Sequence, residues 1–174
     1  MISIEIVSKD MYNEIFDFER KNKSYFETML PPRLEGYFQF ESFIKIMDKL
    51  LVEQEKGEYY MYIIRDEKNS FAGRANLQIH EGKNGKIAEI GYRIDLNYQR
   101  LGFASQSVKL ILEKAFNEFK VVEVTAGTAK DNVGSQKVLE KNGFKKIGEE
   151  RNVFQINGKW VDGILYSKQN YSIA

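Results

Sequence analysis

The chain contains no cysteine and only one histidine among its 174 residues. Without cysteine there is no disulfide, no thiolate metal site and no cysteine nucleophile. A single histidine cannot form a multi-histidine metal site, so we expect no bound metal. A histidine-based triad would depend on His80, which has no visible acidic or serine partner.

Neither sign of charge is in excess, since 26 lysine and arginine residues stand against 25 aspartate and glutamate residues, for a formal net charge of +1. A general nucleic-acid binder or anionic-membrane binder normally shows a basic surplus. We therefore expect no direct binding of nucleic acid or membrane. The amino terminus lacks the features of a signal peptide and no run of about 18 apolar residues occurs, so a cytoplasmic location is expected.

Proline is scarce, with two residues, and the composition is that of an ordinary globular protein, with 43% hydrophobic and 29% charged residues. A chain of this length buries about 70% of its unfolded surface as one unit. We therefore expect a single domain over residues 1–174.

Hydrophobic periodicity predicts strands alternating with helices. Three of the strands form an antiparallel meander, and Asn157-Gly158 is a strong hairpin signal near the end of the chain. The expected strands cover 2–7, 58–66, 70–80, 87–96 and 120–129, with a final hairpin within 153–167. The expected helices cover 8–22, 40–56, 104–119 and 132–143.

The stretch YQRLGFASQSV, residues 98–108, places Gly102 between an extended run and a helix start. Free backbone N–H groups at a helix start form a site for an anion. The three-glycine dinucleotide fingerprint and the Walker A loop both fail to match at this position. Alternatively, Gly102 only makes the turn from strand to helix.

Several motifs in the second half of the chain occur in a recognisable order. They are AEIGYRID, the element Q-x-x-G-x-A from Gln99 to Ala104, N-x-x-S from Asn132 to Ser135, VLEKNGF and INGKWVDGILYS. Together they resemble the GNAT superfamily of acetyl-CoA-dependent N-acetyltransferases, and most of all its ribosomal-protein alanine and serine N-acetyltransferases. The resemblance is thin over residues 1–57.

The resemblance implies an α+β fold, an α/β/α sandwich whose mixed, mostly antiparallel sheet has about seven strands and about four helices. This sheet is expected to splay between its fourth and fifth strands, at 87–96 and 120–127, and the pantetheine arm of acetyl-CoA enters the gap. Gly91 lies in the middle of the first of these strands, which fits a bulge where another backbone approaches.

Acetyl-CoA is the implied co-substrate, and successive N–H groups from Arg100 to Ser105 would bind its diphosphate without a lysine. A Cβ at position 102 would crowd the phosphates or forbid the turn. Asn132 would hold the pantetheine, cap its helix, or do both. The implied cofactor-binding residues are Ile94, Gln99, Arg100, Leu101, Gly102, Phe103, Ala104, Ser105, Asn132 and Ser135.

The implied reaction is direct attack of a neutral amine on the acetyl thioester through a tetrahedral intermediate. Glu89 is the candidate base, because a carboxylate in an apolar strand is expected to be buried and thereby made more basic. On this interpretation Glu89→Gln lowers turnover by about tenfold to a hundredfold. The alternative is a structural ion pair of Glu89 with Arg93 or Arg74.

Many GNAT members use a tyrosine seven residues beyond the asparagine as the general acid, but this chain has Leu139 there. The resemblance implies Ser135 as the substitute. Its alternative role is that of a polar residue in the first turn of a helix. The backbone N–H of Tyr92 would polarise the acetyl carbonyl.

Tyr25, Phe26 and Tyr37 belong to an aromatic segment that would form a lid over the acceptor, or would pack the first helices on the sheet. The expected acceptor is a protein N-terminal α-amine, which at pH 7 is already about 10% neutral. The alternatives are a small amine, such as a polyamine or an antibiotic, and a non-catalytic module that binds acyl-CoA or a partner protein. Either a monomer or a homodimer is compatible with the sequence.

Overall fold

Seven strands form one sheet in the order β1-β2-β3-β4-β5-β7-β6 in the computed structural model, which describes residues 1–172. Every neighbouring pair is antiparallel except β4 and β5, which are parallel. The strands are β1 Ser3–Ile6, β2 Tyr59–Arg65, β3 Phe71–Gly82, β4 Gly85–Ile94, β5 Glu123–Ala129, β6 Lys145–Ile156 and β7 Lys159–Gln169. The α-helices are α1 Tyr12–Phe26, α2 Phe40–Glu55, α3 Phe103–Glu113 and α4 Val133–Lys141. The predicted α+β fold with a mixed sheet is confirmed.

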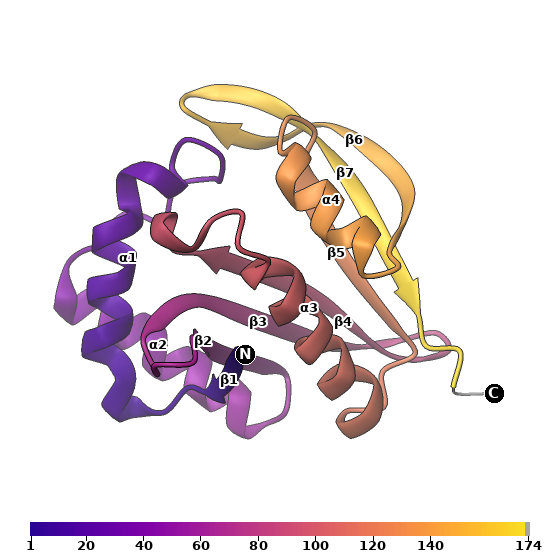
Figure 1. Cartoon of the computed structure of the whole chain (residues 1–174), viewed down its shortest axis with the longest axis horizontal. Helices are drawn as coiled ribbons and strands as arrows, with labels where there is room; N and C mark the ends of the chain where they lie inside the picture. Colours follow the sequence, from indigo (N-terminus) through magenta and orange to yellow (C-terminus); the bar gives the residue numbers. More distant parts are fainter. Residues whose placement is uncertain (173–174) are drawn as a thin grey trace.

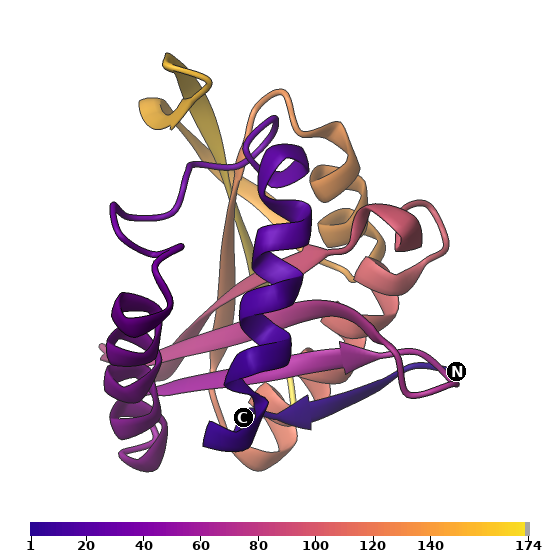
Figure 2. The same cartoon turned by 90° about the vertical axis from the view of Figure 1, so that its left-hand side faces the viewer.

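The helices cover both faces of the sheet, with α1 and α2 on one face and α3 and α4 on the other (Figures 1 and 2). Strand β2 lies between two apolar layers, and its side chains alternate between them as the pleat requires. Met61 and Ile63 belong to the core beneath α1 and α2, whereas Tyr62 and Ile64 belong to the core beneath α3. The predicted α/β/α sandwich is therefore confirmed.

The parallel pairing of β4 with β5 is short. It covers three residue pairs and ends at Glu89 opposite Thr125. Beyond that point the two strands diverge, so the rest of β4 and β5 border a gap in the sheet (Figure 1). The splay expected between the fourth and fifth strands is confirmed.

The bulge expected at Gly91 is wrong, because β4 keeps an unbroken register with β3 through Gly91 opposite Asn76. A side chain at this position would instead require the neighbouring Asn76 side chain to move. A Cβ on Gly91 would lie 2.8 Å from Oδ1 of Asn76, which is closer than two such atoms approach.

Three elements differ most from the sequence-based prediction. The helix expected over 8–22 begins as a 3-10 turn, Lys9–Met11, and continues as α1 to Phe26. The first half of β6, residues 145–152, was not predicted, because its sequence KKIGEERN has no alternation of apolar and polar residues. In the structure these residues are almost entirely exposed, so the strand needs no such alternation. The helix expected over 104–119 leaves α-helical geometry after Glu113 and continues as a π-helical turn, Lys114–Glu118. Within residues 1–172, no helix is long and apolar enough to cross a membrane.

Candidate active site

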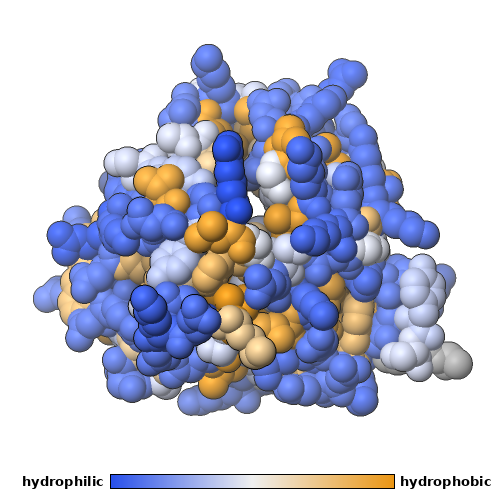
Figure 3. Space-filling model, viewed as in Figure 1, coloured by the Kyte–Doolittle hydropathy of each residue, from blue (hydrophilic) through white to orange (hydrophobic). Residues whose placement is uncertain are grey.

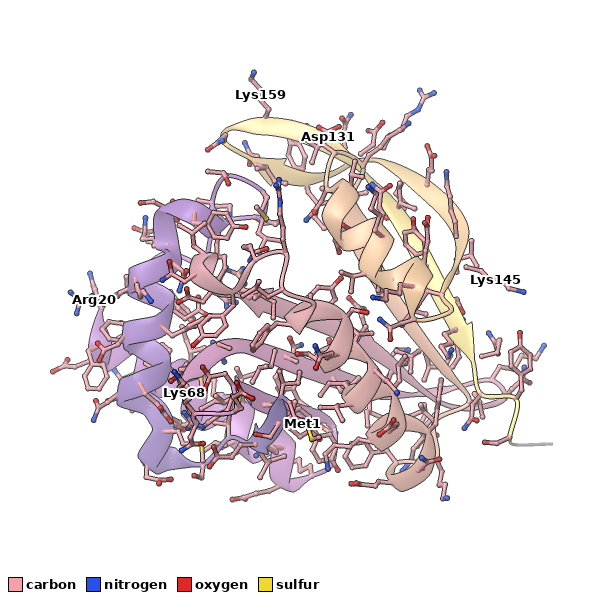
Figure 4. The ribbon with its side chains drawn as sticks, in the orientation of Figure 1. Met1, Arg20, Lys68, Asp131, Lys145 and Lys159 are labelled. Carbon is pink, nitrogen blue, oxygen red and sulfur yellow. The ribbon has the colours of Figure 1, made fainter. Side chains whose placement is uncertain are left out.

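A cavity of about 1280 Å³ lies where β4 and β5 diverge. Its walls are these two strands, the N-terminal ends of α3 and α4, the loop between α1 and α2, and the β6–β7 hairpin. Figure 3 shows the surface hollowed between the part that carries α1 and the part that carries α4. In Figure 4, Lys159 on the hairpin and Asp131 before α4 lie at the same end of the molecule as this opening. The cavity therefore receives side chains from both halves of the sheet.

The N-terminus of α3 supplies a row of unpaired backbone donors to this cavity. Gly102 has a φ of +81° and Arg100 a φ of +60°, and the first helical bond runs from Gln106 N to Gly102 O. Within residues 1–172, the N–H groups of 100–105 donate to no backbone or side-chain acceptor. Because the positive end of the helix dipole adds to these donors, the residues fit a diphosphate.

The remaining predicted cofactor residues lie around this loop. Gln99 Nε2 donates to the carbonyl of Ile94 at 2.8 Å and so ties the loop to the end of β4. Asn132 Oδ1 accepts from the Ser135 N–H at 3.1 Å, which confirms its role as the cap of α4. All ten predicted residues line the cavity except Leu101, which is 60% exposed and does not contribute to the lining.

Tyr92 and Ser135 meet across the gap, at a distance of 2.8 Å between Tyr92 Oη and Ser135 Oγ. Burial raises the pKa of Tyr92 to about 12, and the hydrogen bond to Ser135 acts in the opposite direction. The phenol therefore remains protonated near neutral pH and can donate. Leu139, at the position of the usual tyrosine, is 1% exposed and belongs to the core.

The Tyr92 hydroxyl was missed by the sequence analysis, which assigned a role only to the backbone N–H of this residue. Its contact with Ser135 depends on how α4 packs beside β4, and no local pattern reveals that packing. The register of the sheet supports the expected direction of the N–H. Asp95 N–H donates to Ala72 O, so by alternation the N–H of Tyr92 points away from β3 and into the gap.

Glu89 does not lie where the sequence analysis expected it. Its side chain is exposed, and it does not line the cavity. It faces the same side of the sheet as Arg93, but its strand neighbours are Gln78 and Thr125. The expected burial is therefore wrong. The alternative ion pair with Arg93 or Arg74 is also absent from the ion pairs of residues 1–172.

These arginines instead surround Glu19 of α1. Its carboxylate accepts from Arg33 Nη2 at 2.5 Å and from Arg74 Nη1 at 2.8 Å, and Arg93 Nη1 lies 3.8 Å from it. Burial alone would raise the pKa of Glu19, but Arg74, Arg33 and Arg93 together hold it below the usual 4.5. Arg74 Nη1 also donates to the Tyr37 hydroxyl at 3.2 Å. We call Glu19 and the three arginines the arginine cluster.

The arginine cluster was not predicted as a unit. Arg74 and Arg93 are directly opposite each other on β3 and β4. Like charges in that position repel, so a shared counter-ion is needed. The two arginines in otherwise apolar strands were a signal for such a counter-ion, but the sequence did not show that α1 supplies it.

The three aromatic residues expected near the acceptor all line the cavity. Phe26 and Tyr37 are also buried, at 3% and 5% exposure, and Arg93 lies 5.2 Å from the centre of the Phe26 ring. These two rings therefore form part of a fixed wall and pack the first helices against the sheet. Tyr25 is half-buried at the same wall.

Comparison with known proteins identifies relatives of this chain. The family model described as "Acetyltransferase (GNAT) domain" matches residues 12–145. A Bacillus subtilis (strain 168) protein described as a probable N-acetyltransferase, YjcK, is 32% identical over 151 residues, which cover 86% of this chain and 83% of the relative.

Two solved structures share the fold. The ribosomal-protein-S5-alanine acetyltransferase from Vibrio fischeri matches with a TM-score of 0.91 and 22% identity, over 99% of this chain and 95% of that chain. The spermidine N-acetyltransferase from Vibrio cholerae, solved with CoA and spermine, matches with a TM-score of 0.82 and 17% identity, over 97% of this chain and 95% of that chain. The family resemblance inferred from the motifs is confirmed, and the chain belongs to the GNAT family of N-acetyltransferases.

Proposed function

We propose that this N-acetyltransferase transfers the acetyl group of acetyl-CoA to the N-terminal α-amine of a protein or peptide. The observation that carries the proposal is the scarcity of bases in the cavity. Among the described residues, Asp131 is the one carboxylate in the lining, it is exposed, and no histidine is present. Burial raises the pKa of the lining residues Tyr25 and Tyr59, which makes these phenols poor proton acceptors at neutral pH.

A site with no strong base favours an amine that loses its proton readily. At pH 7 a peptide α-amine is about 10% neutral, whereas an amine with the pKa of lysine is neutral in about one molecule in 2,500. The arginine cluster acts in the same direction, since nearby positive charges favour the neutral form of an amine. The α-amine is therefore the acceptor that this cavity suits.

The descriptions of the two solved structures each name one candidate acceptor. The Vibrio fischeri protein is named for an alanine of ribosomal protein S5, and the Vibrio cholerae protein was solved with spermine. A polyamine carries several positive charges and would meet three guanidinium groups in this cavity. The charge of the lining thus supports the N-terminal acceptor over the polyamine.

In the proposed reaction the neutral amine attacks the acetyl carbonyl, forming the C–N bond. The Tyr92 N–H donates to the developing oxyanion in the gap. As the C–S bond breaks, the Ser135 hydroxyl donates its proton to the departing thiolate and takes one from the Tyr92 hydroxyl, and water reprotonates Tyr92. The proton of the new ammonium leaves to water, which completes the balance.

The test is release of free thiol from acetyl-CoA, measured with a panel of peptides and small amines that includes spermidine. We expect release that depends on peptides with free α-amines and falls to background when the same peptides are N-terminally blocked. Release with spermidine but not with peptides would contradict the N-terminal acceptor. Binding of acetyl-CoA without acceptor-dependent release would favour a non-catalytic module.

Replacing Ser135 by alanine should lower kcat by about a hundredfold, the lower end of the usual contribution of one general acid. The KM for acetyl-CoA should change by less than about threefold, because the Asn132 cap accepts from the Ser135 backbone and survives the change. Steady-state kinetics measure both values. Tyr92→Phe, which keeps Ser135, should have a smaller effect, and an unchanged kcat in Ser135→Ala would remove this residue from the reaction.

Replacing Glu89 by glutamine should leave kcat within about twofold, because this carboxylate is exposed and lies outside the cavity lining. This prediction differs from the loss expected from the sequence alone, because that expectation depended on a buried Glu89. The comparison uses saturating acetyl-CoA and the best peptide of the panel. A loss of tenfold or more would restore Glu89 as the base, acting through water.

A further inference from the structure

The arginine cluster carries more positive charge than its single carboxylate neutralises. The Glu19 side chain is 1% exposed, whereas those of Arg33, Arg74 and Arg93 are 29%, 13% and 18% exposed, and all three arginines line the cavity. Three positive charges and one negative charge leave a net charge of +2. Partly buried excess charge of this kind is costly unless an anion joins it.

Arg93 is the member of the cluster with donors to spare. Within residues 1–172 its guanidinium donates no hydrogen bond, and its approach to Glu19 at 3.8 Å is an ion pair only. Within residues 1–172, every buried side-chain nitrogen and oxygen has a hydrogen-bond partner. Because the Arg93 guanidinium has none, its N–H groups are not fully buried, and they are reached from the cavity that Arg93 lines. Burial, and to a smaller extent the nearby positive charge of Arg33, lower the pKa of Arg93 to about 10.

The position of Arg93 relates this free guanidinium to the reaction. Arg93 follows Tyr92 on β4, beyond the point where the pairing with β5 ends. Its side chain lies on the α1 side of the sheet, with Glu19, while the Tyr92 N–H points into the gap. A group held by Arg93 is therefore close to the place where the acceptor amine must meet the acetyl carbonyl.

We propose that the acceptor carries a carboxylate close to the amine that is acetylated, and that Arg93, assisted by Arg33 and Arg74, binds this carboxylate. The inference rests on the proposed transfer of an acetyl group to an α-amine, and it specifies a carboxylate close to that amine as the group that the site recognises. A planar carboxylate matches the fork of a guanidinium, which offers paired N–H donors. Such an acceptor is either a peptide with an acidic residue among its first two positions or a free amino acid with its own carboxylate.

The experiment uses acceptor pairs that differ in charge and hardly in size. C-terminally amidated peptides that begin with Asp or Glu are compared with those that begin with Asn or Gln, and free alanine is compared with alaninamide. We expect kcat/KM to be at least about tenfold higher for the acidic member of one of these pairs. The peptide pairs and the amino-acid pair show which source supplies the carboxylate, and a preference in either set supports the proposal.

Variants of the full chain test the assignment to Arg93. In Arg93→Gln the acidic preference should fall to about threefold or less, mainly through a higher KM, while Arg93→Lys, which keeps the positive charge but loses the paired donors, should keep only part of it. Arg20→Gln is the matched control, because Arg20 lies on α1 near Glu19 but is exposed and outside the cavity lining (Figure 4). It should keep the full preference.

The outcomes separate this inference from the proposed function. Thiol release with equal kcat/KM for acidic and neutral acceptors, or a preference for spermidine, overturns the inference. An acidic preference that survives unchanged in Arg93→Gln also overturns it. If no amine in the panel causes release, the proposed function fails instead. If Arg93→Gln does not fold, the acceptor pairs on the unaltered protein decide the matter alone.

Discussion

Gly102→Val should lower the affinity for acetyl-CoA by at least about thirtyfold, equivalent to about 2 kcal/mol. The glycine has a φ of +81° at the start of α3, a conformation that a β-branched residue adopts only with strain. To relieve this strain the loop must rotate, and the unpaired N–H groups of 100–105 then no longer point together into the cavity. Titration calorimetry with acetyl-CoA measures the loss.

Gly57→Val is the matched control for backbone strain. Gly57 has a φ of +76° and lies between α2 and β2, outside the cavity lining. In both glycines an added Cβ meets a single side-chain atom, at 3.3 Å for Gly57 and 3.4 Å for Gly102. Both variants should lose about 1–3 kcal/mol of unfolding free energy, and only Gly102→Val should lose affinity. If the unaltered protein and both variants bound acetyl-CoA with equal affinity, Gly102 would serve only to make the turn before α3.

Glu19→Gln should lower the free energy of unfolding by about 3–5 kcal/mol at neutral pH, the usual cost of removing one partner from a buried ion pair. The cost is large because one carboxylate serves three guanidinium groups, and the glutamine leaves all three partly buried without a counter-charge. Urea denaturation measures this loss. Glu27→Gln, which breaks only the surface pair with Lys23, should cost less than about 1 kcal/mol.

The pH dependence gives a second measure of the same carboxylate. Because the folded protein holds the pKa of Glu19 below its usual 4.5, the ionised carboxylate contributes stability above that value. The contribution is lost as the pH falls through the folded-state pKa. The difference in stability between the unaltered protein and Glu19→Gln should therefore shrink below about pH 4.5. A difference independent of pH would mean that the side chain acts through packing alone.

The sequence predicted those parts of the molecule that depend on local patterns. The meander, the α3 start at Gly102 and the Asn132 cap each follow from neighbouring residues, and each is present in the structure. The Tyr92–Ser135 contact was half predicted, since both residues were named but their hydroxyls were not paired. That pairing joins positions 43 residues apart.

The parts that were not predicted depend on contacts between distant elements. Glu19 looks like any acidic residue in an amphipathic helix until α1 packs over Arg74 and Arg93. The burial expected for Glu89 failed for the converse reason. Its strand is apolar, but no helix covers this position on the α1 side, so its side chain remains in solvent. Strand composition alone does not show how far a covering helix extends.

The divergence of β4 and β5 also gives the sheet four open edges instead of two. The outer edges are guarded against pairing with other chains: β1 has four residues, and β6 is irregular, with charges such as Lys145, Glu149 and Arg151 along it. The inner edges, on β4 and β5, have no such protection of their own. They lie in the cavity, which the helices, the α1–α2 loop and the β6–β7 hairpin enclose. The same charges that hid β6 from the sequence-based prediction thus also oppose pairing of this outer edge with another strand, while the unpaired inner edges of β4 and β5 face the cavity.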